Sequence, residues 1–110
     1  MKVAIIGSRG INIDNLVDYL PEGTDEIVSG GAKGVDTCAR EYANNHGIKL
    51  TEFLPQYKLY GRGAHLKRNH KIIEYADTVL AFWDGESKGT AFVIENCKKL
   101  SKEVRVIIIR

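Results

Sequence analysis

The sequence has few of the features that mark disulfide-bonded, membrane-spanning or strongly charged proteins. Its two cysteines, Cys38 and Cys97, lie far apart on the apolar faces of two expected helices, so we expect reduced, buried thiols and neither a disulfide nor a metal pair. The apolar runs, such as Val106 to Ile109, are far shorter than a membrane span. The formal net charge of +2 permits nucleic-acid binding but is too small to argue for it.

Three common ligand motifs are also missing. A dinucleotide fingerprint, G-x-G-x-x-G after the first strand and an acid after the second, would fall where the chain has Gly7-Ser8-Arg9-Gly10 and Ser29-Gly30, so classical NAD binding is not expected. The Walker A pattern G-x-x-x-x-G-K-[ST] occurs nowhere, which argues against ATP hydrolysis of that type. His65 and His70 lack partners at metal-ligand spacing, so we expect no metal.

The composition is that of an ordinary globular domain. At 110 residues the chain is long enough for one packed core, and we expect a single domain over residues 1–110. Hydrophobic residues make up 44% and charged residues 27%, which excludes a disordered segment. The first residues lead into a strand-like run without a signal-peptide cleavage pattern, and we expect a cytosolic protein with no membrane contact.

Strand-like and helix-like patterns alternate along the whole chain. Short runs rich in β-branched residues predict strands at 2–6, 25–29, 50–54, 78–83 and 104–109. Apolar residues at helical spacing predict helices at about 12–20, 35–46, 64–75 and from about 89 to 100. Residues 55–64 predict a longer loop with Tyr57 and Tyr60, a candidate wall of a site.

This alternation predicts a three-layer, Rossmann-like α/β fold. Five strands joined through helices require a parallel sheet with right-handed crossovers and helices on both faces. The plausible strand orders are 3-2-1-4-5 and 2-1-3-4-5. We prefer 3-2-1-4-5, because it places the glycine-containing loops after strands one and four at the topological switch point, where ligands of such sheets bind.

The glycine-rich turn over residues 29–36 leads from a strand into a helix. Two interpretations explain the glycines at 30, 31 and 34. They either let the backbone come close to a ligand, or they adopt unusual dihedral angles that a tight connection requires. Free N–H groups at the helix start favour an anion such as phosphate. Lys33 and Lys88 would add charge near two such starts, and Arg9 and Arg68 are possible forked phosphate donors.

The sequence therefore predicts a mononucleotide-sized anion site at the carboxyl ends of the strands. We expect it to be formed by Gly7, Ser8, Arg9, Ser29, Gly30, Gly31, Lys33, Gly34, Asp36, Arg68, Asn69, Trp83, Asp84, Gly85, Ser87, Lys88, Gly89 and Thr90.

Several of these residues have an ordinary structural explanation beside the functional one. Arg68 is either a solvated surface arginine or a phosphate ligand. Asp36 either binds a ribose hydroxyl or complements the helix dipole. Thr90 fits a helix cap better than a nucleophile, and Trp83 fits the core or rim better than a nucleobase platform. Asp84 is the best candidate for an active carboxylate, because it ends a strand at the expected crevice.

The order of five short motifs resembles the SLOG superfamily of Rossmann-like nucleotide-binding domains. The motifs are Gly7-Ser8-Arg9, the block from Ser29 to Asp36, Arg68-Asn69, Ala76-Asp77 and Gly89-Thr90. The resemblance covers about the whole chain, and the block from Ser29 to Asp36 is its most specific part. It implies a nucleotide or nucleotide-derived ligand, with no separate cofactor, and a homodimer.

Three branches of the superfamily imply different functions. Lonely Guy phosphoribohydrolases are matched by Arg68, nine residues before Asp77, and by Gly89-Thr90, but Val93 stands where they have glutamate. If this chain is such an enzyme, its catalytic candidates are Asp84, Arg68 and Glu95. The DNA-processing protein DprA implies single-stranded DNA binding, which the net charge does not favour. The small YpsA-like members fit best, and they imply ligand binding or sensing.

Overall fold

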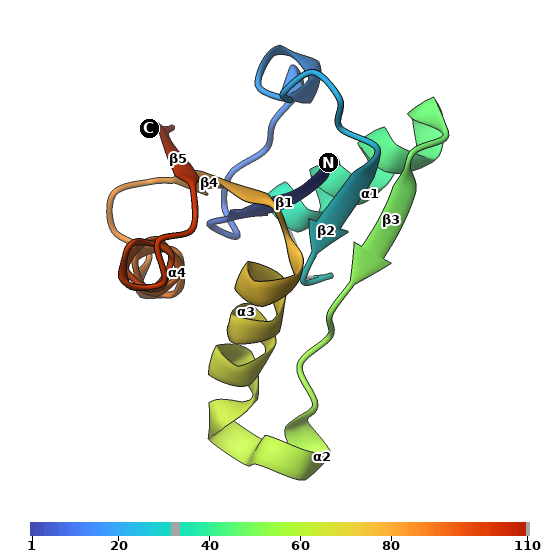
Figure 1. Ribbon diagram of the computed structural model, residues 1–110. Coiled ribbons are helices and arrows are strands. Elements are labelled where there is room, and N and C mark those ends of the chain that lie inside the picture. The colour runs from blue at the N-terminus through green and yellow to red at the C-terminus, as the bar shows by residue number, and fades with distance from the viewer. Residues whose placement is uncertain (32–33, 110) are drawn as a thin grey trace.

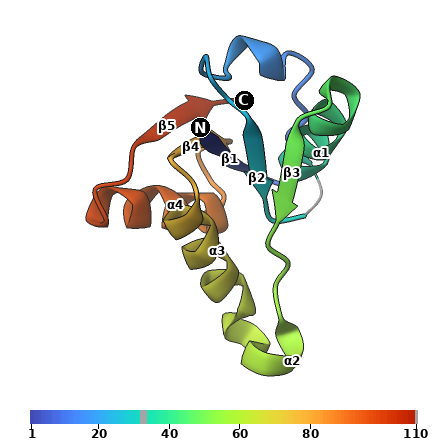
Figure 2. The same cartoon turned by 45° about the vertical axis from the view of Figure 1, so that its right-hand side comes forward.

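A computed structural model describes residues 1–31 and 34–109 of the chain. These residues form an α/β fold around one parallel sheet, whose five strands lie in the order β3-β2-β1-β4-β5 (Figures 1 and 2). The predicted fold class and strand order are therefore confirmed. No helix in the described ranges is both long enough and apolar enough to cross a membrane.

Most of the elements begin and end close to where the sequence patterns place them. The strands are β1 (Lys2–Gly7), β2 (Glu26–Ser29), β3 (Lys49–Glu52), β4 (Thr78–Trp83) and β5 (Val104–Ile108). The helices are α1 (Val35–His46), α2 (Tyr57–Tyr60), α3 (Ala64–Tyr75) and α4 (Lys88–Lys99), with 3₁₀ turns η1 (Leu16–Asp18) and η2 (Gly61–Gly63). Helix α1 ends at Gly47, whose φ of 63° gives the left-handed cap predicted for a glycine stop.

Alternate residues of the central strands enter two different cores. Val3 and Ile5 of β1 pack with α1 and the chain around η1 on one face of the sheet. Ala4 and Ile6 pack with α3 and α4 on the other face. Because both faces are covered, β1 and β4 are apolar at nearly every position and do not alternate with polar residues.

The first connection differs from the helix predicted over about 12–20. It contains the single 3₁₀ turn η1, although Ile13 and Leu16 are buried as the pattern required. The side chain of Cys38 replaces part of the missing helical bonding, since its Sγ accepts from the Ile13 amide and donates to Asn12. The burial of the apolar residues was therefore predicted correctly. The prediction of a full helix was wrong, because tertiary contacts override helix propensity.

The chain between β3 and α3 was expected to be a loop and instead contains α2 and η2. With residues 64–73 of α3 these elements form an arm over residues 53–73, whose outer part extends beyond the sheet in both views (Figures 1 and 2). The outer part of this arm is exposed, and Leu59 keeps 70% of its surface accessible.

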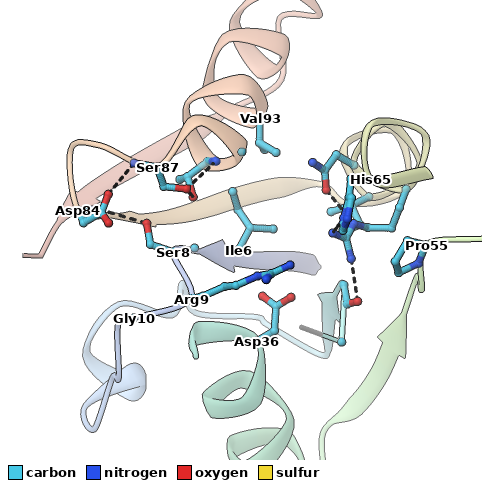
Figure 3. A pocket seen from close by; sticks show the side chains of 18 of the residues that line it. Ile6, Ser8, Arg9, Gly10, Asp36, Pro55, His65, Asp84, Ser87 and Val93 are labelled. Atoms are coloured by element: carbon cyan, nitrogen blue, oxygen red, sulfur yellow. Dashed lines mark hydrogen bonds between the residues drawn. The ribbon is translucent and has the colours of Figure 1, made fainter. Parts of the chain in front are cut away.

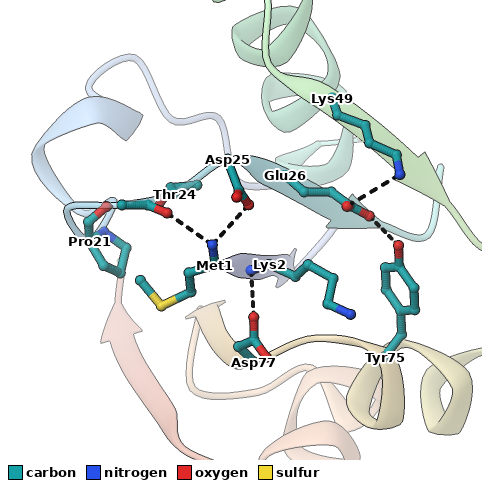
Figure 4. Close-up of polar contacts among 10 residues, drawn as sticks. Met1, Lys2, Pro21, Thr24, Asp25, Glu26, Lys49, Tyr75 and Asp77 are labelled. Atoms are coloured by element: carbon teal, nitrogen blue, oxygen red, sulfur yellow. Dashed lines mark hydrogen bonds and ion pairs between the residues drawn. The ribbon is translucent and has the colours of Figure 1, made fainter.

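A buried carboxylate joins three elements at the amino-terminal end of the sheet. Glu26 of β2 is 7% exposed and accepts hydrogen bonds from the hydroxyls of Tyr75 and Thr51, while Lys49 lies 3.5 Å from its other oxygen (Figure 4). The Tyr75 hydrogen bond contributes most to holding the pKa of Glu26 below its ordinary value, and the Thr51 hydroxyl and Lys49 lower it further.

This arrangement predicts a pH-dependent contribution of Glu26 to stability. A carboxyl with a lowered folded-state pKa stabilises the fold above its unfolded pKa of about 4.3 and loses that effect as the pH falls through the folded value. We expect Glu26→Gln to lower the free energy of unfolding by about 1 kcal/mol at pH 7 and by less near pH 3. Urea unfolding at both pH values measures this, with Glu22→Gln, an exposed site, as the control. Equal stability of wild type and Glu26→Gln at pH 7 would contradict it.

Candidate functional site

A cavity of about 750 Å³ lies at the carboxyl ends of the central strands, between the loops after β1, β2 and β4 and helix α3 (Figure 3). Its position is the predicted one beside the topological switch point. The predicted residues that line it are Gly7, Ser8, Arg9, Gly30, Gly31, Asp36, Arg68, Asn69, Asp84, Ser87, Gly89 and Thr90.

The loops after β1 and β4 are bonded directly to each other. The Ser8 amide donates to the Phe82 carbonyl at 3.1 Å, and the Asp84 amide donates to Ser8 Oγ at 3.4 Å. Ser8 is buried, and its hydrogen bond with Asp84 is partly buried at the cavity wall. The two loops therefore form one continuous side of the cavity.

The carboxylate of Asp84 shapes the turn that precedes α4. Its Oδ1 accepts from the amides of Glu86 and Ser87, both at 2.8 Å. These backbone hydrogen bonds, that from Ser87 first, lower the pKa of Asp84 below its ordinary value. Asp84 is therefore ionised at neutral pH and suits a structural role better than that of a general acid.

Helix α4 begins at the edge of the cavity, and its first two residues, Lys88 and Gly89, are exposed. Ser87 is the N-cap, and its Oγ accepts from the Thr90 amide at 3.5 Å, while its carbonyl accepts from Trp83 Nε1 at 3.0 Å. The Trp83 indole thus stabilises the turn before α4 through this hydrogen bond. A Cβ at Gly89 would meet no atom within 4 Å, so space is open beside this helix start. Such a start attracts anions through its N–H groups and its dipole.

Arg68 of α3 is half-buried in the opposite wall. Its guanidinium donates to the Gly30 carbonyl and to Asn69 Oδ1, both at 2.8 Å. Burial lowers the pKa of Arg68, and the negative charge of Asp36 opposes that effect. An arginine stays protonated at neutral pH under such influences, so the wall carries a fixed positive charge.

His65 and Tyr57 continue this wall toward the arm. His65 Nδ1 lies 3.4 Å from a guanidinium nitrogen of Arg68, and its Nε2 lies 2.8 Å from the Tyr57 hydroxyl. Because a guanidinium can only donate, a neutral His65 accepts at Nδ1 and donates from Nε2 to Tyr57.

The glycines of the β2–α1 turn make room for protein atoms. A Cβ at Gly30 would lie 2.3 Å from Arg68 Nη1, and one at Gly34 would lie 2.3 Å from the Arg9 carbonyl oxygen. Gly34 also has a φ of 76°, which side chains rarely adopt. The structure therefore supports the interpretation of a tight connection for Gly34. At Gly30, the missing side chain leaves the space that the Arg68 guanidinium occupies.

Asp36, in the first turn of α1, is 6% exposed and directs its carboxylate into the cavity beside the Arg9 side chain (Figure 3). Between these charged groups and the start of α4, the lining is apolar and consists of Ile6, Ile72 and Val93. The cavity thus combines two cations, a buried acid, an apolar strip and a helix start.

Some predicted residues are not among those that line the cavity. Ser29 is fully buried in β2, Lys88 and Glu95 are exposed on α4, and the remaining ones are Gly34, Trp83 and Gly85. Lys33 lies outside the described residues. Glu95 follows Val93 by two positions on a helix, so the two side chains point in very different directions.

Other lining residues were missed or were predicted only as parts of a loop. Pro55 and Tyr57 belong to the segment expected as a wall, and Gly10 ends the first glycine loop. Ile6, Ile72 and Val93 have the pattern of core residues, which hides their partial contact with the cavity. The usable signal for His65 was its spacing of three residues from Arg68, because such residues share one face of a helix.

Comparisons with protein-family models, curated proteins and solved structures found no significant match. Within residues 1–31 and 34–109, no group of three or more His, Cys, Asp or Glu side chains could hold a metal ion.

The contacts of Gly34 predict a test of the turn. Gly34→Ala places a methyl group against the Arg9 backbone in a strained conformation, and we expect a loss of about 1–3 kcal/mol in the free energy of unfolding. Gly63→Ala is the matched control, because a Cβ there meets no atom within 4 Å and the φ is −80°. Urea unfolding measures both, and equal stability of the two variants would disprove the assignment.

Proposed function

We propose that the cavity binds a nucleotide or a nucleotide-derived phosphate ligand and that the protein acts as a binding or sensing module. The carrying observation is that the accessible start of α4 and the cations of Arg9 and Arg68 line the same cavity. An anionic group gains from each of these features, and two arginines can hold phosphate oxygens with forked hydrogen bonds. The resemblance of the motifs to SLOG domains supports the same class of ligand, and a homodimer remains a prediction from that resemblance.

We propose binding with weak or no glycosidase turnover. A phosphoribohydrolase needs a carboxylate near the sugar to stabilise the developing positive charge. Among the described residues, the carboxylates that line the cavity are Asp36 and Asp84, and Asp84 is engaged in the turn before α4. Val93 occupies the place of the glutamate in Lonely Guy enzymes, and the exposed Glu95 does not line the cavity.

Binding of nucleoside monophosphates tests this function at Arg68. We expect Arg68→Gln to weaken the binding of AMP, GMP, CMP or UMP by about tenfold or more, because a charge-assisted contact to phosphate is lost. Lys71→Gln is the matched control, since Lys71 is an exposed cation on the same helix and does not line the cavity. Isothermal titration calorimetry measures both variants.

Two outcomes of these titrations would contradict the proposal. Equal affinity of Arg68→Gln and wild type would remove Arg68 from the site. Chromatography of the nucleotide incubations measures the release of free base. Release by wild type that is lost in Asp84→Asn would make the protein an N-glycosidase.

Binding of single-stranded nucleic acid is a second candidate, which the composition of the arm favours. Residues 53–73 contain five of the 16 Lys and Arg residues and none of the 14 Asp and Glu residues of the chain. Tyr57 and Tyr60 are exposed on the same segment, and exposed aromatic rings among cations are typical of surfaces on which bases stack.

An oligonucleotide titration separates the two candidates. If the arm binds nucleic acid, a single-stranded oligothymidylate binds with an affinity that falls steeply as salt rises, and Lys58→Gln with Arg62→Gln reduces that salt dependence. AMP does not compete in that case. If the oligothymidylate does not bind at low salt, or if AMP displaces it, the arm has no role in binding and the cavity remains the proposed binding site.

A further inference from the structure

The two edges of the sheet differ in how well they are protected from further strand pairing. Strand β3 forms one edge, and β5 forms the other (Figures 1 and 2). The β3 strand begins with Lys49 and ends with Glu52, which form ion pairs with Glu26 and Arg40 respectively. Strand β5 has the sequence VRVII and a single charged residue. Because charged residues protect an edge and apolar edges associate, β5 is the edge that is open to a partner.

The main-chain groups of alternate β5 residues point away from the sheet. The Ile109 amide donates to the Trp83 carbonyl at 2.9 Å, so Ile109 faces β4, and the register along β5 is continuous. Successive residues of a strand direct their N–H and C=O groups to opposite sides, so those of Val104, Val106 and Ile108 face outward. Val106 and Ile108 also keep 37% and 47% of their surface accessible. The edge therefore offers both hydrogen-bonding groups and apolar side chains.

The partner that matches this edge is an extended, apolar strand whose own edge is open. Strand β5 of a second copy meets that description, and an antiparallel pair of identical strands is related by a two-fold axis. Such a pair closes on itself, because each copy then presents only the protected β3 edge. The net charge of +2 gives two copies little mutual repulsion. These features favour a closed dimer over a growing filament.

The position of the single charge selects the register of this pair. Pairing that overlaps the whole strand puts Val106 on the two-fold axis, where its outward-facing groups bond those of Val106 in the second copy. Val104 then lies opposite Ile108 of the second copy, and Arg105 lies opposite Ile107. An axis at Arg105 would instead place two guanidinium groups directly opposite each other, which is destabilising. Full overlap therefore gives the most hydrogen bonds and keeps the like charges from facing each other.

We propose that two copies of the chain pair antiparallel along β5, with Val106 on the two-fold axis, so that their sheets become continuous. None of the five described residues of β5 lines the cavity, so this pairing does not depend on the proposed ligand. The homodimer expected from the resemblance thereby gains a defined interface. Pairing of two short strands buries little surface, and the dimer should be weak and need about 0.1 mM protein to be well populated.

Sedimentation velocity of the full chain tests the interface. Wild type should shift from monomer to dimer as its concentration rises from about 10 to 500 µM. Val106→Pro removes an outward-facing N–H and spares the bonds to β4, and Val106→Lys brings two like charges together on the axis, so both variants should stay monomeric. Val17→Lys is the control, since Val17 is 59% exposed outside β5, and it should dimerise as wild type does. Urea unfolding checks that each variant is folded.

Disulfide cross-linking with oxidised glutathione tests the register. Val106→Cys should form a linked dimer, because hydrogen-bonded antiparallel partners have Cα atoms about 5.5 Å apart. Arg105→Cys should remain largely unlinked, because its two copies would lie on a diagonal, more than about 7 Å apart. Wild type controls for Cys38 and Cys97, which are buried.

Three results would overturn this inference. They are a wild type that stays monomeric at about 0.5 mM, a dimer that persists in folded Val106→Lys, and equal cross-linking of Val106→Cys and Arg105→Cys. Dimerisation of wild type and of Val17→Lys, together with its loss in Val106→Lys and selective cross-linking at Val106→Cys, would support it.

Discussion

The pairing of β1 with β4 at the centre of the sheet is the constraint on which the cavity depends. These strands are far apart in sequence and adjacent in space, with a register that runs from Val3 opposite Thr78 to Gly7 opposite Phe82. The connections that follow these two strands pass to opposite faces of the sheet. The two loops therefore diverge, and a crevice is left between them. The bond from the Ser8 amide to the Phe82 carbonyl continues this pairing to the first residue of the loop after β1.

Glycines beside these strands let the other elements of the site pack closely against them. A Cβ at Gly7 would lie 2.6 Å from the Phe82 carbonyl oxygen and 2.7 Å from a methyl carbon of Val35, so α1 can approach β1 only where a side chain is missing. That approach brings Asp36 to the floor of the cavity, one residue after Val35. Gly30 does the same for Arg68 on the opposite wall. The charged groups of the site are thus positioned by the absence of side chains at neighbouring positions.

Sequence patterns predicted the sheet well because its two central strands are buried on both faces and therefore nearly continuous in apolar residues. The convergence of Arg9, Asp36 and Thr90 followed from topology alone, since loops at the carboxyl ends of neighbouring parallel strands must meet. The conformation before β2 did not follow, because Cys38 supplies bonding that a local pattern cannot contain. The contact of His65 with Arg68 lies within the helix predicted over 64–75, whereas its contact with Tyr57 depends on α2, which was not predicted because the segment was expected to be a loop.

The central claim is that an anionic nucleotide occupies this cavity with its phosphate at the start of α4. Amide shift mapping by ¹H–¹⁵N correlation spectroscopy during titration with AMP and inorganic phosphate tests it most directly. The account predicts that the largest shifts fall on Gly89 and Thr90 with both probes, and that AMP adds shifts at Gly30 and Asp36. Shifts that cluster on the outer part of the arm or on β5, with Gly89 and Thr90 unmoved, would contradict it.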